Sequence, residues 1–91
     1  MEIQYSFKPE EIIEDFKLIG ETFMLGSQKV KTGKGKRMYA KLISSKGYDD
    51  IAVELINKAK YIHSHGLKNN VVLNKDQIRV LKELVVYCVG L

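Results

Sequence analysis

The stretch of sequence that decides the fold runs from Leu73 to Val89 and reads LNKDQIRVLKELVVYCV. Asn74 and Gln77 have the spacing of a capping box, in which each side chain bonds to the backbone N–H of the other residue, so a helix is predicted to begin here. Leu73 and Ile78 occupy the two positions of a hydrophobic staple. Apolar residues then recur every three or four positions until the last turn is apolar nearly all round. Such a helix is usually central, so the rest of the chain or a second subunit is expected to cover it.

The composition is that of one globular domain. The chain has 91 residues, of which 45% are apolar and 29% are charged, and we treat residues 1–91 as a single domain. No apolar run approaches the length of about 18 residues that a membrane span needs, and residues 1–7 lack the pattern of a secretory signal. Cys88 is the only cysteine, which excludes an internal disulfide and makes a cytoplasmic location the simplest interpretation.

The charge is divided along the chain. Residues 1–22 hold six acidic and two basic residues, whereas the remainder holds 13 basic and five acidic residues, and the net charge is +4. This segregation indicates one of two arrangements. Either the basic part attracts nucleic acid, or the acidic first helix lies against a basic surface of its own fold.

The chain begins with a short extended segment and a predicted helix. Met1 to Phe7 alternates apolar and polar residues, which indicates a strand or an extended arm packed on helices. Pro9 suits the first helical position, and the two glutamates after it suit the positive end of the helix dipole. Apolar residues keep helical spacing as far as Met24, so a helix is predicted from Pro9 to Met24. Gly20 weakens this helix by roughly 1 kcal/mol relative to alanine.

A glycine-rich basic segment follows the first helix. Gly26 to Arg37 contains three glycines and five bases but no acid, and it is predicted to be an exposed, mobile loop. Met38 to Ser45 fits either a short helix or one strand of a hairpin whose other strand would be Phe23 to Lys31. We favour a helix from Arg37 to Ser45, because Gly47 fits the left-handed position that often follows a helix end.

A third helix is predicted from Asp49 to His65. Asp49 can cap its start, an apolar stripe runs along it, and Gly66 can end it. The predicted fold is therefore all-α, a small four-helix domain with a short extended N-terminal arm. Its helices are Pro9 to Met24, Arg37 to Ser45, Asp49 to His65 and Asn74 to Val89. The runner-up is an α+β fold with a hairpin at about residues 22–45.

The basic segment does not match a known phosphate-binding motif. A Walker motif would need a hydroxyl at Gly35 and a glycine at Gln28, and a dinucleotide motif would need a glycine at Met38. What remains is either a solvated charged loop or a cluster that contacts a nucleic-acid backbone without reading its sequence. The residues predicted for contact with nucleic acid or an acidic partner are Lys29, Lys31, Lys34, Lys36 and Arg37.

No group of residues in the sequence indicates catalysis. His63 and His65 lie close together, but no neighbouring acid or cysteine completes a metal site. Cys88 falls on the apolar stripe of the last helix, which predicts a buried, inert thiol. We therefore expect no catalytic residue, no metal and no cofactor, and a protein that is not an enzyme.

Two features indicate a protein partner. Tyr61 falls on the polar face of the third helix beside His65 and Lys58, where an exposed tyrosine can anchor a partner. The apolar end Leu84 to Leu91 either fills the core or pairs with a second copy, which favours a homodimer. The expected function is a non-catalytic small regulatory or adaptor protein that docks on another protein, of the kind that bacterial and phage genomes often encode. The alternative is a nucleic-acid-binding regulator that contacts the phosphate backbone through residues 29–37.

Overall fold

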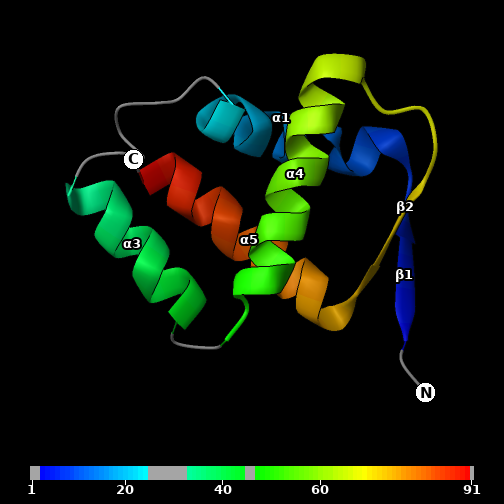
Figure 1. The fold of residues 1–91 in the computed structure, drawn as a ribbon. Coiled ribbons are helices and arrows are strands. Elements are labelled where there is room, and N and C mark those ends of the chain that lie inside the picture. Colours follow the sequence, from blue (N-terminus) through cyan, green and yellow to red (C-terminus); the bar gives the residue numbers. More distant parts are fainter. Residues whose placement is uncertain (1–2, 25–32, 45–46, 91) are drawn as a thin grey trace.

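Four helices and a two-stranded sheet make up the part of the chain that the structure describes (Figure 1). The computed structural model describes residues 3–24, 33–44 and 47–90. The helices are α1 (Pro9–Met24), α3 (Gly33–Ser44), α4 (Asp49–His65) and α5 (Lys75–Gly90), and the strands are β1 (Gln4–Phe7) and β2 (Val71–Asn74). This mostly helical architecture fits the predicted all-α class broadly, with the addition of a small sheet.

Helix α5 lies at the centre of the domain, where it packs against α1, α3, α4 and β2. Figure 1 shows α4 crossing it and α3 lying along its side. A capping box fixes its start, because the Asn74 N–H donates to Gln77 Oε1 at 2.8 Å and the Gln77 N–H donates to Asn74 Oδ1 at 2.8 Å. The buried residues of α5 are Val80, Leu81, Leu84, Tyr87 and Cys88. The predicted capping box is confirmed, and so is the central place of this helix.

Helices α1 and α4 pack closely because a glycine lies where they cross. Phe16 and Ile19 of α1 are completely buried in the core. A Cβ added at Gly20 would lie 2.5 Å from the carbonyl oxygen of Ala59 and 2.8 Å from Cβ of His63. These distances are shorter than Cβ contacts in real proteins, so only glycine fits at this crossing without a shift of the helices. Packing at this crossing therefore requires glycine at position 20, in spite of its low helix propensity.

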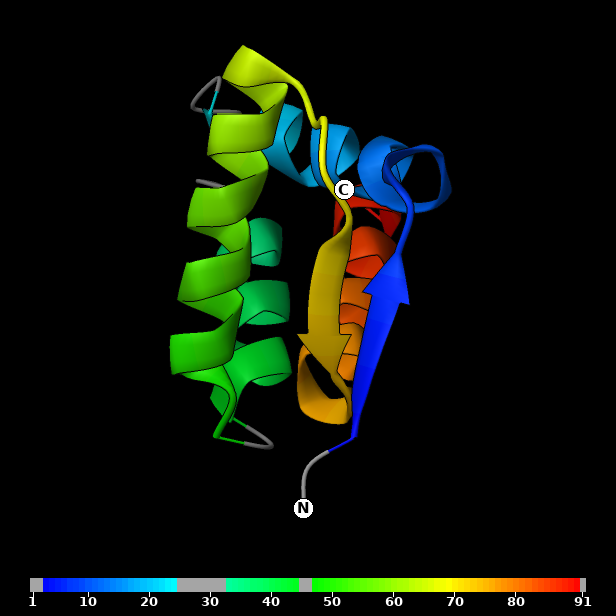
Figure 2. The same ribbon diagram turned by 90° about the vertical axis from the view of Figure 1, so that its right-hand side faces the viewer.

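The small sheet pairs a segment near the start of the chain with the segment before α5. Strands β1 and β2 are antiparallel, with Tyr5 opposite Leu73 and Phe7 opposite Val71 (Figure 2). Val71 and Leu73 are buried, so one face of β2 belongs to the core. The sequence left open whether the N-terminal segment is a strand or an arm, and Gln4–Phe7 is a strand. Strand β2 is not among the elements that the sequence analysis predicts.

The two ends of α4 confirm one predicted cap and correct the other. Gly66 has a φ of +81°, and its N–H donates to the carbonyl oxygen of Ile62 at 2.7 Å, which confirms the predicted helix end. The predicted N-cap at Asp49 is wrong, because Asp49 is already helical and Tyr48 precedes the helix without a side-chain cap hydrogen bond. Asp49 and Asp50 instead lie in the first turn, where carboxylates interact favourably with the helix dipole.

Helix α3 begins four residues before the predicted start at Arg37. The predicted loop is therefore wrong from Gly33 onward, since α3 already starts at Gly33. Gly35 is buried, and its carbonyl oxygen accepts a hydrogen bond from the Tyr87 hydroxyl at 3.2 Å. This contact with α5 stabilises a helical turn that two glycines make locally unfavourable.

The predicted hairpin at about residues 22–45 is wrong for the described residues, because residues 22–24 and 33–44 are helical. Gly47 has a φ of +66°, in the left-handed region that was predicted for it. The rest of the predicted basic loop, which includes Lys29 and Lys31, lies outside the described residues. The predicted helix end at Ser45 lies outside them too.

Candidate functional site

A groove lies between α3 and α5, which run side by side away from the sheet (Figure 1). It has a volume of about 500 Å³, and its lining is mainly apolar. The described residues that line this α3–α5 groove are Met38, Lys41, Leu42, Lys82, Glu83, Val86 and Tyr87. The groove is open to solvent and long enough to involve residues on successive turns of both helices.

The sequence of α5 explains why an apolar groove is left at the surface. The core-facing stripe of α5 ends with Leu84, Tyr87 and Cys88, which are buried. Val86 and Val89 lie outside this stripe, and 69% and 73% of their surfaces remain exposed. The last turn was predicted to be apolar nearly all round, and the domain covers only one side of it. An exposed apolar strip on a central helix is typical of a surface that another molecule covers.

Tyr87, which lines the groove, belongs to a cluster of three aromatic rings. The ring of Tyr87 stacks on Phe23 with a centroid distance of 5.7 Å, and both rings contact Tyr39, at centroid distances of 6.0 Å and 5.9 Å. Burial raises the pKa of Tyr87, and the neighbouring Cys88 and Tyr39 raise it further. Burial likewise raises the pKa of Tyr39. The cluster therefore holds neutral phenols and connects α3 with both α1 and α5.

Positive charge flanks the groove. Lys41 and Lys82 are exposed, and Glu83 is the one acid among the described residues of the lining. Lys36 and Arg37 are exposed on the first turns of α3, and Arg37 Nε donates to the carbonyl oxygen of Gly33 at 3.2 Å. Of the five bases that were predicted to act together, Lys34, Lys36 and Arg37 lie on α3. Lys29 and Lys31 lie outside the described residues.

Four exposed acidic residues of α1 lie outside the α3–α5 groove. Helix α1 packs against α4 and α5 with its apolar side. The exposed acidic residues of α1 are Glu10, Glu11, Glu14 and Glu21. Their carboxylates face solvent, so the structure separates an acidic face on α1 from the basic flanks of the α3–α5 groove.

A second hollow lies at the end of α4 and brings together the three residues that were predicted to contact a partner. Lys58, Tyr61 and His65 all line it. The rings of Tyr61 and His65 stack with a centroid distance of 4.3 Å and an interplanar angle of 16°. The hollow has a volume of about 630 Å³. The remaining described residues that line this α4 hollow are Ile62, Gly66, Leu67, Lys68, Asn69, Asn70 and Val71.

The residues considered for chemistry lie apart from one another. Cys88 is buried as predicted, and burial raises the pKa of its thiol while a hydrogen bond with Thr22 partly offsets this rise. His63 is half-buried at the crossing of α1 and α4, whereas His65 is exposed in the α4 hollow. Within residues 3–24, 33–44 and 47–90, no group of three histidine, cysteine or acidic side chains is arranged to hold a metal ion.

None of the described helices is long and apolar enough to cross a bilayer. Comparison of the chain with protein-family models, with curated proteins and with solved structures gave no match.

The α3–α5 groove was missed by the sequence analysis, although part of its signal was present. Val86 and Val89 lie on the side of the last helix opposite the buried Leu84 and Cys88. From the sequence, these additional apolar residues indicate either a core contact or a dimer contact. Met38 and Leu42 belong to the segment Met38 to Ser45, for which the sequence predicts only a helix or a strand. The groove itself depends on how α3 lies against α5, which local spacing does not define.

Proposed function

We propose that this protein is a non-catalytic docking protein whose α3–α5 groove binds an acidic amphipathic helix of a partner protein. The observation that carries the proposal is the exposed Val86 of α5, which lines a mainly apolar groove together with the cations Lys41 and Lys82. An amphipathic helix that lies in a groove presents apolar side chains three and four residues apart. Acidic residues beside those anchors would face the two lysines.

The two kinds of contact have different roles in this binding mode. Apolar side chains of the partner would remove Val86, Met38 and Leu42 from water, and this burial favours the bound state. Lys41 and Lys82 remain at the margin of the interface, where charges mainly raise the association rate and select acidic partners. The acidic face of α1 would repel such a partner and so favours binding at the groove.

The test uses a helical peptide of about 15 residues with leucines at helical spacing and glutamates elsewhere. Calorimetric titration of the wild-type protein should show binding, and a scrambled peptide of the same composition should bind much more weakly. The variant Val86→Asp should lower the affinity on the order of tenfold or more, because it places a charge at the centre of the apolar contact.

Val53 provides a matched control, because it is an exposed valine on the outer face of α4 with half of its surface accessible. Val53→Asp introduces the same charge away from the groove and should leave peptide binding unchanged. The proposal is wrong if the scrambled peptide binds equally well, or if Val86→Asp and Val53→Asp have equal effects.

The second candidate function is nucleic-acid binding through Lys29, Lys31, Lys34, Lys36 and Arg37. The exposure of Lys36 and Arg37 at the start of α3 favours it. A variant with Lys31, Lys34, Lys36 and Arg37 changed to serine should then lose salt-sensitive binding to random duplex DNA. Duplex binding that this variant loses, together with no peptide binding by the wild type, would replace the docking proposal with this one.

A second copy of the chain is another occupant of the exposed apolar strip. Val86→Asp should then convert a dimer into a monomer in sedimentation experiments. A wild-type protein that sediments as a dimer and releases no subunit when the acidic peptide is added would identify the strip as a homodimer interface rather than a docking groove.

A further inference from the structure

We propose that the α4 hollow binds single-stranded nucleic acid, with one unpaired base stacked on Tyr61 and the adjoining phosphates held by Lys58 and Lys68. This site is separate from the α3–α5 groove, and the inference does not depend on the docking function. It rests on an exposed aromatic stack, a positive lining and an apolar base, all brought to one place by the end of α4 and the loop before β2.

Tyr61 is held in place as a stacking surface. Its ring is covered on one side by His65 at 4.3 Å, yet 63% of the residue is exposed, so the other side of the ring faces solvent. His65 Nδ1 lies 3.1 Å from the carbonyl oxygen of Tyr61, and a proton on Nδ1 makes this a hydrogen bond that fixes the imidazole. A fixed aromatic pair loses little conformational freedom on binding. Its open face accepts a nucleobase, because every base has a flat π-surface.

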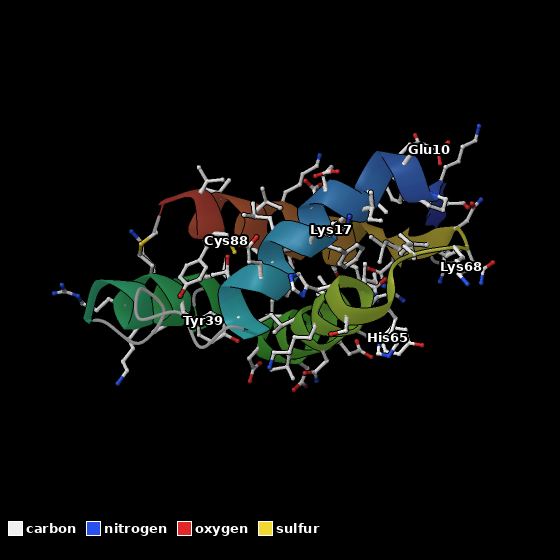
Figure 3. The ribbon with its side chains drawn as sticks, turned by 90° about the horizontal axis from the view of Figure 1, so that it is seen from above. Glu10, Lys17, Tyr39, His65, Lys68 and Cys88 are labelled. Carbon is white, nitrogen blue, oxygen red and sulfur yellow. The ribbon has the colours of Figure 1, made fainter. Side chains whose placement is uncertain are left out.

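The charges that surround Tyr61 select an anionic ligand. Lys58 and Lys68 are exposed and line the same hollow, and none of its described lining residues is acidic. Figure 3 shows His65 at the end of α4 and Lys68 on the loop that follows, at the same end of the molecule. Flexible ammonium groups beside an aromatic surface match the alternation of phosphates and bases along a single strand.

The remaining lining suits an unpaired base better than a duplex. Ile62 and Val71 are buried at the base of the hollow, so an inserted ring would contact apolar side chains. Asn70 Nδ2 donates to the Ser6 hydroxyl at 3.3 Å, which holds its amide in place beside the hollow. A base inside a duplex is already stacked and cannot enter. The site therefore discriminates by strandedness rather than by sequence.

The test is fluorescence anisotropy with labelled oligo-dT and oligo-U of about 10 nucleotides and with a duplex of the same length. The wild-type protein should bind both single strands more tightly than the duplex at low salt. Tyr61→Ala should weaken this binding on the order of tenfold, because it removes the stacked base contact. Tyr61→Phe keeps the ring and should bind like the wild type.

The lysines are tested through the dependence of affinity on salt. Changing Lys58 and Lys68 together to alanine should lower the slope of log affinity against log salt by about 1.4, since each phosphate contact on a single strand contributes about 0.7. Lys17 and Lys75 are exposed elsewhere on the surface, so changing both to alanine is the matched control for net charge. This control should leave the slope nearly unchanged.

The inference is overturned by absence of single-strand binding at low salt, by equal affinity for the duplex, or by full affinity in Tyr61→Ala. It is also overturned if Tyr61→Ala abolishes binding of the acidic peptide, because Tyr61 would then be a protein contact. Val86→Asp should bind single strands normally, so failure at this hollow and failure at the α3–α5 groove are separate results. Circular dichroism of each variant checks that the exposed substitutions leave the fold intact.

Discussion

The crossing of α1 with α4 and the pairing of α3 with α5 are two helix contacts built in opposite ways. At the first, Gly20 lets the backbones approach so closely that a single added carbon would meet Ala59. At the second, no described side chain of α3 is fully buried, and the contact leaves a groove beside Val86. The difference shows how one chain can pack one helix pair closely and leave an exposed groove between another pair.

The largest effect is expected from Gly20→Ala, which should break the close contact between α1 and α4. The new Cβ would lie too near the Ala59 carbonyl, and overpacking of this kind costs about 1–3 kcal/mol, more than the gain in helix propensity returns. Urea unfolding should show the loss in the free energy of unfolding. Gly33→Ala is the control, because a Cβ at Gly33 meets no atom within 4 Å. Equal stability of the two variants would show that the crossing is not tightly packed.

The next effect is expected from Asn74→Ala, which removes the cap of α5, the helix that packs against α1, α3 and α4. Both hydrogen bonds of the capping box depend on Asn74 and Gln77, so the free energy of unfolding should fall by about 1 kcal/mol. Asn74→Ser should keep most of the stability, because serine also caps helices. Asn57 is exposed in the middle of α4, and Asn57→Ala should not destabilise the protein. An unchanged free energy of unfolding in Asn74→Ala would contradict the assignment of Asn74 as the helix cap.

A more local effect, no larger than that of Asn74→Ala, is expected from Tyr87→Phe, which sharpens the comparison by loosening α3 alone. The variant keeps the aromatic ring but loses the hydrogen bond to Gly35, at a cost of about 1 kcal/mol. Hydrogen exchange should accelerate for the amides of α3 while those of α1 and α4 stay protected. Tyr61→Phe, which changes an exposed hydroxyl, is the control. Uniformly faster exchange in all helices would contradict an independently held α3.

The smallest effect is expected from alkaline pH, which should lower the free energy of unfolding through the Tyr87 hydroxyl. Burial raises the pKa of Tyr87 above its ordinary value of 10.0, so the unfolded chain loses this proton before the folded protein does. The contribution of Tyr87 to the free energy of unfolding is therefore fully present below pH 10 and falls as the pH rises toward the pKa of Tyr87 in the folded protein. Unfolding measured from pH 8 to 11 should show this fall, and Tyr87→Phe should reduce it. A flat profile would show that Tyr87 is solvated.

The parts of the fold that depend on neighbours in sequence could be predicted. Two predicted helix ends are confirmed: the capping box of α5, formed by Asn74 and Gln77, and the C-terminal end of α4 at Gly66. Both involve residues only three or four positions apart. The start of α3 was missed because the bond from Tyr87 to Gly35 joins residues 52 positions apart. Strand β2 was missed for the same reason, since its partner lies at the other end of the domain.

The two candidate sites differ in the same way, because one joins residues close in sequence and the other depends on how two helices pack. Tyr61, His65 and Lys58 share one helix face, so helical spacing alone placed them together, and the structure has them around one hollow. Lys68 joins them only through the loop that follows Gly66, which spacing along a helix does not describe. The α3–α5 groove is entirely a product of how two helices lie side by side, so its lining could not be assembled from the sequence.

The pairing of β1 with β2 also orders events during synthesis. Gln4–Phe7 leaves the ribosome early, whereas its partner Val71–Asn74 emerges only after α1, α3 and α4 have been made. Until then the first strand has open backbone groups along the edge where β2 will pair. Helices α1, α3 and α4 all pack on α5, so they lack this shared packing surface until β2 and α5 have been made. A nascent chain halted before residue 71 should therefore remain sensitive to protease along its whole length.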